Sequence, residues 1–564
     1  MPTRVKSAAI TATAIPAAIA TPTPPGLRTN ILYSGDNLDL LRDGWLPPDS
    51  VDLIYLDPPF NSNRNYNLIF EDESGRKSDA QIVAFEDIWH WGPRAEEHYT
   101  YLTNTGLHGG AVPVQVSGLI AAMRQALGPN QMFAYLVEMT VRLVELRRVL
   151  KPSGSIFLHV NEVANSYLRV MMDAIFGAKQ FRNEIVWHYT GWNKKLRGKF
   201  ESRSDTILFY AKDGVEQQVF NSYSRPWASK EEYVKVRKQK VRVDEDGREY
   251  VLSDRGKGQR IKRYLDEALA SGAFIDNVWD IDKLNNSSKE KLNWPTQKPL
   301  ALLERIIESA TNPGDVVLDP FCGCGTALVA AQASARKWIG MDVSYLAIAV
   351  MRARLQDVFG LKDIEIEGLP KEVEGVRQLI DTPRGRFKAQ ALALSLIGAA
   401  PIGGDEVKMG ADAGMDGKIT FTEENGRLET IIVSVKTGKV QRNDIADLKN
   451  SVDREKAAMG IFVTLEEPTG PMRTERDTAG SYVSGLWQRS FPKIQFLTFR
   501  EILEDKKKPD IPASAHSAYM KAKRYVKPAD QLSLESMALG AAAAAMTSAD
   551  DAFDDEEPVE DDEE

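Results

Sequence analysis

The stretch from 315 to 342 constrains the fold of this 564-residue chain more than any other part of the sequence. An apolar strand over Val316–Asp319 runs into the loop Phe321-Cys-Gly-Cys-Gly-Thr326, and a helix over 327–335 and a strand over 338–342 follow. Strand, glycine loop, helix and strand form the repeating unit of an open α/β sheet. The pattern therefore predicts a Rossmann-like α/β domain.

The loop and the end of the second strand indicate what this sheet would bind. Gly323 and Gly325 let a backbone approach a ligand closely, and the N-terminus of the following helix favours a carboxylate. Asp342 ends the second strand, where an acid suits ribose hydroxyls. The three-glycine fingerprint of dinucleotide sites is missing. An amino-acid-bearing nucleoside therefore fits the loop better than a dinucleotide does.

A second strand end carries an acceptor motif. The short apolar run 50–56 leads directly into Asp57-Pro58-Pro59-Phe60. The two prolines fix a rigid turn at the edge of the sheet. The Asp57 carboxylate and the Pro58 carbonyl can accept both protons of a base amine, whose lone pair is otherwise delocalised into the ring, and Phe60 can stack on the base. A proline-rich turn with a capping aspartate is the alternative interpretation.

Taken together, the two motifs resemble the amino-methyltransferases of DNA. The acceptor motif precedes the glycine loop, as in the permuted (beta) group of adenine methyltransferases. The segment Trp294-Pro-Thr-Gln-Lys-Pro299, just before the loop, also matches the family. The resemblance covers about 30–355, interrupted by an insert.

The resemblance implies roles for individual residues. Asp57, Pro58, Pro59 and Phe60 would act at the target base. S-adenosyl-L-methionine would be held by a larger set, namely Asp36, Thr296, Lys298, Asp319, Pro320, Phe321, Gly323, Gly325, Thr326 and Asp342. Cytosine members usually carry serine at the position of Asp57, which favours adenine N6. Cytosine N4, an RNA substrate, and a DNA-binding module that only senses the cofactor remain as alternatives. Methyl transfer itself needs no metal.

The insert, over about 211–290, lies where the family carries its target-recognition region. A base inside a duplex must be flipped out to reach such a site, so a partner surface for double-stranded DNA is expected. Aromatic and cationic residues alternate just before the insert, at Trp192, Lys194, Lys195, Arg197 and Lys199. Such residues contact phosphates and stack on bases. A solvated basic surface with core aromatics explains them equally well.

After residue 380 a second α/β pattern begins. A helix over 387–397, a hairpin turning at Glu424-Asn-Gly426, and Asp416 with Ser434-Val-Lys436 resemble an Mrr-type restriction endonuclease domain. In that family two acids hold magnesium near the scissile phosphate while a lysine stabilises charge. Ser434 occupies the position of the second acid, and Gln390 stands where a glutamate is often found. A DNA clamp without activity, a plain packing domain and a bifunctional restriction-modification enzyme that cleaves with magnesium all remain open.

Composition sets the remaining expectations. The net charge of −9 comes from the tail, because residues 550–564 hold eleven acids and no base, which leaves the rest at +2. DNA is therefore not excluded as a partner. The two cysteines, Cys322 and Cys324, are too close for a good disulfide, and no apolar run is long enough to span a bilayer, so a cytoplasmic protein is expected. Homodimer formation and a restriction partner are left open.

We accordingly expect four regions. They are a disordered leader (1–28), a methyltransferase domain (29–370), a smaller restriction-endonuclease-like α/β domain (380–508) and a largely disordered tail that ends acidic (509–564).

Overall fold

The protein is described from a computed structural model. It describes residues 26–59, 65–71, 77–86, 89–191, 197–198, 200–254, 259–402 and 415–516, without 223, 226, 228, 286–287, 289, 293, 295, 362, 383 and 514. Within 65–71, 77–86 and 515–516, and at 425, only the backbone is described.

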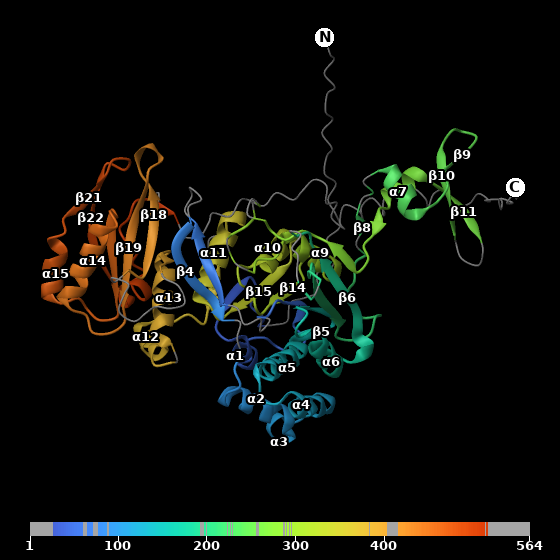
Figure 1. The fold of residues 1–564 in the computed structure, drawn as a ribbon, viewed down its shortest axis with the longest axis horizontal. Helices are drawn as coiled ribbons and strands as arrows, with labels where there is room; N and C mark the ends of the chain where they lie inside the picture. The colour runs from blue at the N-terminus through green and yellow to red at the C-terminus, as the bar shows by residue number, and fades with distance from the viewer. Residues whose placement is uncertain are drawn as a thin grey trace, which may run out of the picture.

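A nine-stranded sheet forms the centre of the molecule (Figure 1). Its strands, in spatial order, are β13 (Val278–Asp280), β6 (Phe181–His188), β7 (Ser204–Ala211), β5 (Leu150–Val160), β2 (Val51–Leu56), β14 (Val316–Asp319), β15 (Lys337–Asp342), β1 (Ile31–Ser34) and β16 (Glu365–Glu367). Among them only β7 runs antiparallel to its neighbours β5 and β6. The expected α/β sheet is confirmed.

The order of these strands reverses between β2 and β14. From β14 the chain continues to β15 on one side, whereas from β2 it continues to β5 on the other. Parallel strands end at the same edge, and a crevice opens where the order reverses. The turn after β2 and the glycine loop after β14 therefore meet at one place.

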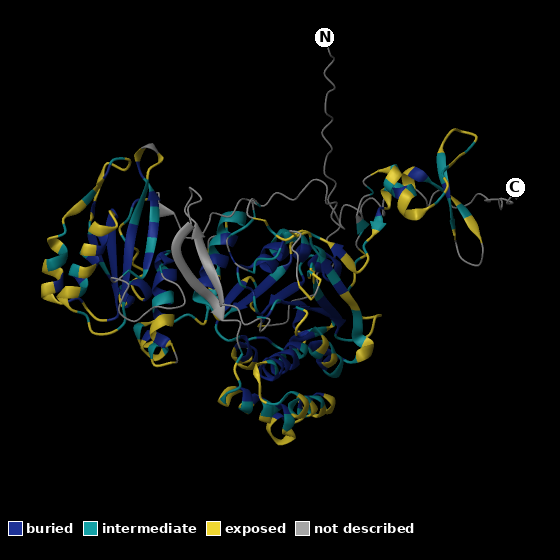
Figure 2. Ribbon diagram, in the orientation of Figure 1, coloured by how far each residue is buried: buried dark blue, intermediate teal, exposed yellow. Residues whose placement is uncertain are grey.

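Helices bury both faces of the sheet. Neighbouring residues point to opposite faces of a strand, and both members of the pair Ile31 and Leu32 are fully buried, as are Leu53 and Ile54. One face packs against α1 (Asn37–Arg42), α5 (Gln131–Val149) and α6 (Asn165–Phe176), with α2 (Pro93–Thr103), α3 (Thr105–His108) and α4 (Val114–Leu127) stacked outside them. The other face packs against α9 (Leu300–Ala310), α10 (Thr326–Ala333) and α11 (Tyr345–Phe359). Figure 2 shows the dark, buried sheet between these layers.

Most of the predicted insert forms a small separate unit. It consists of β8 (Ser224–Arg225), α7 (Lys230–Arg237), β9 (Arg242–Val243), β10 (Glu249–Asp254), β11 (Arg260–Tyr264), α8 (Leu265–Ala270) and β12 (Ala273–Phe274). β9, β10 and β11 make a three-stranded sheet of their own. The chain then returns to the central sheet as β13, so the last part of the stretch 211–290 belongs to the main fold.

A six-stranded sheet follows in the C-terminal part. It contains β17 (Ala400–Pro401), β18 (Gly417–Thr422), β19 (Leu428–Lys436), β20 (Met459–Thr464) and β23 (Ile494–Thr498), with β24 (Ala515–His516) beside β18. β18 and β19 pair antiparallel around a short 3-10 turn, Glu424–Gly426, which confirms the predicted hairpin.

Helices cover this second sheet and join it to the first. α14 (Arg442–Arg454) and α15 (Gly470–Asp477) pack on one face, while α13 (Gly385–Ile397), preceded by α12 (Val373–Ile380), packs on the other. The chain also contains a short helix, α16 (Phe499–Leu503), and two hairpins. One hairpin is β21 (Ser481–Ser484) with β22 (Arg489–Pro492), and the other is β3 (Asn65–Glu71) with β4 (Lys77–Glu86). α13 also contacts α11, and Tyr345 at the start of α11 packs against the core of the second sheet. Among the described helices, none combines the length and apolarity needed to cross a membrane.

Candidate active site

The two acids predicted at strand ends lie at the same edge of the central sheet. Asp57 follows β2, and Asp319 ends the neighbouring β14. Asp57, Pro58, Pro59 and Asp319 line one cavity of about 1010 Å³. Phe60 lies outside the described residues. The topology thus joins two motifs that are about 260 residues apart in the chain, as expected of a site at a switch point.

Lys298 contacts the Asp57 carboxylate directly. Its Nζ donates a hydrogen bond to Asp57 Oδ2 and lies 3.3 Å from the Thr296 carbonyl oxygen. Both Thr296 and Lys298 line the cavity. The resemblance predicts these two residues beside the cofactor, and the structure places Lys298 on the acceptor motif.

Beneath Asp57 lies a buried polar group that the sequence reasoning missed. His159 Nδ1 is 3.9 Å from Asp57 Oδ1 and 3.3 Å from the Tyr55 hydroxyl, while His159 Nε2 is 3.5 Å from Asp205 Oδ2. Lys283 Nζ lies 3.5 Å from the same Asp205 oxygen. The contact depends on the antiparallel pairing of β5 with β7, which brings His159 near the end of β5 close to Asp205 near the start of β7.

The charges of this group follow from its burial. Burial, together with the positive charge of Lys298, lowers the pKa of His159 although Asp205 and Asp57 oppose the shift. Burial would raise the pKa of Asp205, but its contacts with His159 and the attraction of Lys283 and Lys298 lower it to about 2. Asp205 is therefore an anion that holds His159 in place beside Asp57.

The glycine loop after β14 has the conformation that its residues predict. Gly323 has φ +49°, and a Cβ there would lie 3.2 Å from Trp294 Nε1. Gly325 has φ +76°, and a Cβ there would lie 2.7 Å from Met351 Cγ. Gly325 does not line the cavity, whereas Gly323, Phe321, Pro320 and Thr326 do. A side chain at Gly325 would therefore clash with α11, and a side chain at Gly323 would crowd the Trp294 indole.

Two backbone amides hold Asp342 beside this loop. Gly323 N donates to Asp342 Oδ2 at 2.9 Å, and Ser344 N donates to Oδ1 at 2.8 Å. Burial nevertheless raises the pKa of Asp342 to about 6, against these two hydrogen bonds. Burial also raises the pKa of Asp319 well above its ordinary value, and the charges of Asp57 and Asp342 add to that shift. Two neighbouring acids in one cavity thus favour a ligand that donates hydrogen bonds or carries positive charge.

The free cysteines of the loop are buried. Cys322 Sγ donates to the Met341 carbonyl oxygen at 2.9 Å, and Cys324 Sγ lies 3.7 Å from the Thr326 hydroxyl. Burial raises the pKa of both thiols. They therefore pack as neutral side chains.

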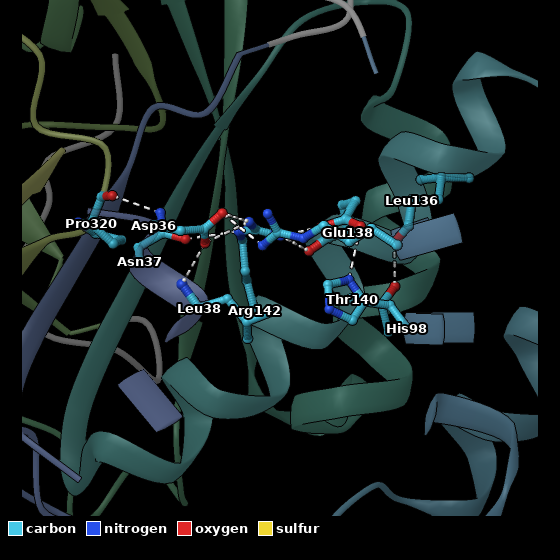
Figure 3. A network of polar contacts seen from close by, with 10 residues as sticks. Asp36, Asn37, Leu38, His98, Leu136, Glu138, Thr140, Arg142 and Pro320 are labelled. Atoms are coloured by element: carbon cyan, nitrogen blue, oxygen red, sulfur yellow. Dashed lines mark hydrogen bonds and ion pairs between the residues drawn. The ribbon is translucent and has the colours of Figure 1, made fainter. Parts of the chain in front are cut away.

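Asp36 also lines the cavity and is held by two arginines, of which Figure 3 shows Arg142. Arg142 Nη2 donates to Asp36 Oδ1 at 2.9 Å, and Arg94 Nη2 donates to Asp36 Oδ2 at 2.7 Å. Burial would raise the pKa of Asp36, but the two guanidinium groups lower it. Asp36 also accepts from Leu38 N at the start of α1. It is thus a fixed carboxylate on the cavity wall.

Figure 3 shows how this contact continues into the protein. Arg142 Nη1 donates to Glu138 Oε2 at 2.7 Å, and His98 Nδ1 lies 2.8 Å from Glu138 Oε1. Arg142 Nε donates to Asn37 Oδ1, and Asn37 in turn donates to the Pro320 carbonyl oxygen at 2.7 Å. α2, α5, α1 and the glycine loop are therefore connected through one buried guanidinium group, which the sequence did not reveal.

The predicted DNA-contacting residues are only partly described. Arg197 is exposed, whereas Trp192, Lys194, Lys195 and Lys199 lie outside the described residues. Within the insert, several cations have acidic partners, including Lys262 with Asp244 at 2.9 Å and Arg248 with Asp266 at 2.9 Å. DNA contact by this region stays a prediction.

The nuclease-like residues of the C-terminal sheet meet as the hairpin register requires. Asp416 precedes Gly417, which pairs with Val433, so Asp416 lies beside Ser434. Asp416 Oδ2 accepts from Val435 N at 2.6 Å, and Gln390 Nε2 donates to Asp416 Oδ1 at 2.8 Å. Ser434 is buried, and Lys436 is half-buried at the end of β19. Among the described residues, no group of three or more His, Cys, Asp or Glu side chains could hold a metal ion.

The central sheet thus carries an acid-lined cavity beside an Asp-Pro-Pro turn at its switch point, the place where open α/β sheets bind ligands. The family model described as "DNA methylase", of the N6/N4 methyltransferases, matches residues 51–351. That match covers more than half of the sequence, so the chain belongs to this family of DNA methyltransferases. The model described as "NACHT-associated inactive Restriction Endonuclease 1" matches residues 402–504. The C-terminal region is thus related to restriction endonucleases, and its assignment to the Mrr type stays a prediction.

Curated relatives agree with this family. The DNA adenine methyltransferase YhdJ of Escherichia coli K12 is 25% identical over 345 residues, which cover 61% of this chain and 89% of that protein. The type II methyltransferase M.HpaI of Haemophilus parainfluenzae is 30% identical over 217 residues, covering 38% of this chain and 58% of that enzyme. The crystal structure of the M1.HpyAVI–SAM complex covers 58% of this chain and 98% of its own at 17% identity, with a TM-score of 0.29.

Proposed function

We propose that this protein transfers a methyl group from S-adenosylmethionine to N6 of a flipped-out adenine in double-stranded DNA. The observation that supports this proposal most is the single cavity that Asp57, Pro58, Asp319 and Asp342 all line. The acceptor motif precedes the cofactor loop in the chain, so we also assign it to the permuted group. Asp57 in place of serine, and the adenine methyltransferase among its relatives, favour adenine over cytosine N4.

The residues fit the methyl donor. A Cβ at Gly323 would crowd the Trp294 indole, which also lines the cavity, and the acidic and hydrogen-bonding side chains suit the ribose and the charged amino-acid end of the donor. We assign Asp342 to the ribose hydroxyls, and Asp319, Phe321 and Gly323 to the methionine end. When bound, the donor supplies a methyl carbon activated by its sulfonium group.

The protein's own groups would activate the amine. The Asp57 carboxylate and the Pro58 carbonyl oxygen each accept a hydrogen bond from one N–H of the amine, which localises the lone pair of its nitrogen and aligns it for in-line attack. Methyl transfer leaves a surplus proton on the nitrogen, and Asp57 is the nearest acceptor to take it and pass it to water. Lys298 acts as a positioning residue because it donates to Asp57, and His159, beside Asp205, lies 3.9 Å from the same carboxylate.

The test is methyl transfer from labelled S-adenosylmethionine to unmethylated duplex DNA, followed by nucleoside analysis. We expect label in N6-methyladenine with the wild type and none with Asp57→Ala, while Asp453→Ala, at a surface position remote from the cavity, behaves as the wild type. Label in N4-methylcytosine would replace adenine by the second candidate base. Absence of label on varied genomic DNA would contradict the proposal.

For the C-terminal region we propose a domain over about 380–508 that does not cut DNA. Ser434 replaces an acid, and a hard divalent cation would lose a charged ligand there. Asp416 is already engaged by Gln390 and the backbone of β19. Magnesium-dependent cleavage by the native chain would overturn this and restore the bifunctional alternative.

A further inference from the structure

The nuclease-like region contributes a wall to the cavity of the methyltransferase site. The cavity that Asp57 and Asp342 line is also lined by α13 and the segment after it, including Phe387, Gln390, Leu394 and Ile402. In Figure 1, α13 and α11 lie where the second sheet meets the central one. The family match of the methyltransferase ends at 351, so this wall comes from outside it.

Two apolar side chains that line this cavity are exposed to solvent. Val343, next to Asp342, is 62% exposed, and Phe387 on α13 is 44% exposed. Both line the cavity, one from each sheet's region. Exposed apolar surface in a concave site favours an apolar, flat ligand group.

The ligand group that would lie against Val343 is indicated by the preceding residue, Asp342, which is the proposed ribose acceptor. Asp342 ends β15, and Tyr345, three residues further on, packs against the core of the second sheet. α13 belongs to the same core and contacts α11, which begins at Tyr345. The α13 wall is thus continuous with the residues that follow the proposed ribose acceptor.

Asp416, the acid of the nuclease-like pattern, supports this wall. Asp416 accepts from Gln390 of α13 at 2.8 Å, and its backbone carbonyl accepts from Ile402 N at 2.9 Å. Gln390 and Ile402 both line the cavity. The acid that would hold a metal in a nuclease therefore ties α13 and the start of the second sheet together.

We propose that α13 completes the methyl-donor site, with the Phe387 ring covering the adenosyl moiety of S-adenosylmethionine. The inference rests on the proposed function, since it takes the same donor. It gives the nuclease-like region a role in methylation that needs no cleavage.

The test compares Phe387→Ala with Trp487→Ala in the full chain. Trp487 is an aromatic side chain of the same region with the same 44% exposure, and it does not line the cavity. Affinities for S-adenosylmethionine and for S-adenosylhomocysteine are measured by calorimetry without DNA, and DNA affinity is measured separately. We expect Phe387→Ala to raise both Kd values about tenfold, as loss of aromatic stacking predicts, and Trp487→Ala to leave them unchanged.

Phe387→Leu covers the case in which the alanine variant does not fold, because it keeps apolar volume and loses the flat ring. It should weaken donor binding by a smaller factor. Wild-type donor affinity in both Phe387 variants would overturn the inference and leave the proposed function standing. Lost DNA affinity with unchanged donor affinity would also overturn it, by placing DNA against Phe387 and the exposed cations Arg386 and Lys388 of the same wall. Failure of the wild type to bind the donor would overturn both.

Discussion

Lowering the pH should weaken binding of S-adenosylmethionine through one carboxyl group. Burial raises the pKa of Asp342 to about 6 in the free protein, although Gly323 N and Ser344 N donate hydrogen bonds to it. In the proposed site the ionised Asp342 carboxylate accepts from the ribose hydroxyls, whereas the protonated group would lose most of that capacity. The form that binds therefore predominates above pH 6 and disappears as the pH falls through that value.

The pKa sets the size of the effect. At pH 5 roughly one molecule in eleven carries an ionised Asp342, and at pH 7.5 nearly all do, so Kd should rise about tenfold between them. Asp319 and Cys322 are the titratable neighbours at the loop. The pKa of Cys322 is raised well above its ordinary value, so the thiol stays neutral throughout this range. Burial raises the pKa of Asp319 well above its ordinary value too, and a requirement for its anion would steepen the dependence.

Calorimetry without DNA between pH 5 and 8 measures this dependence, with folding monitored by circular dichroism at each pH. Asp342→Asn should bind the donor weakly and with little change across the range. Asp510→Asn, at an exposed acid in the C-terminal region, is the matched control and should follow the wild type. A wild-type Kd that stays constant from pH 5 to 7.5 would refute the reasoning. Equal steepness in Asp342→Asn would move the titration to Asp319.

Three further results are expected. Asp57→Ala should lower kcat about 10²- to 10⁴-fold with donor affinity retained, and a loss confined to KM for the donor would contradict the assigned role. Arg142→Leu should destabilise the fold by about 3–5 kcal/mol in urea unfolding, because it strands Glu138 and Asp36, whereas Arg377→Leu at an exposed pair should cost under about 1 kcal/mol. Equal losses of unfolding free energy in the two variants would show that the buried network around Arg142 does not stabilise the fold. Ser434→Glu alone should produce no magnesium-dependent nicking of plasmid DNA, because Gln390 still holds Asp416; nicking by this variant would show that one acid was all the site lacked.

The sequence predicted the sheet and its two strand-end motifs because each rests on local patterns. Buried strands before Asp57 and Asp342, and a glycine loop after Asp319, are short signals that burial on both faces enforces. The hairpin around Gly426 was predictable for the same reason.

Contacts between distant segments could not be read in this way. Lys298 reaches Asp57 across 241 positions, and Arg142 reaches Asp36 across 106. Arg142 is one of several charged residues in the sequence of α5, and only the packing of α5 against α1 makes it a buried junction. Such residues become visible when strand order and helix placement are known.

In the C-terminal region one acid serves packing. Ser434 stands where the resemblance to Mrr-type nucleases predicts a second acid, and Asp416 accepts from Gln390 and the backbone of β19. A carboxylate satisfied by donors of the protein favours a rigid arrangement of α13. Rigidity of α13 has a consequence at the methyltransferase cavity because its residues line it. Asp416→Ala should therefore raise the Kd for S-adenosylmethionine, which calorimetry without DNA measures, and an unchanged Kd would show that Asp416 does not support the α13 wall.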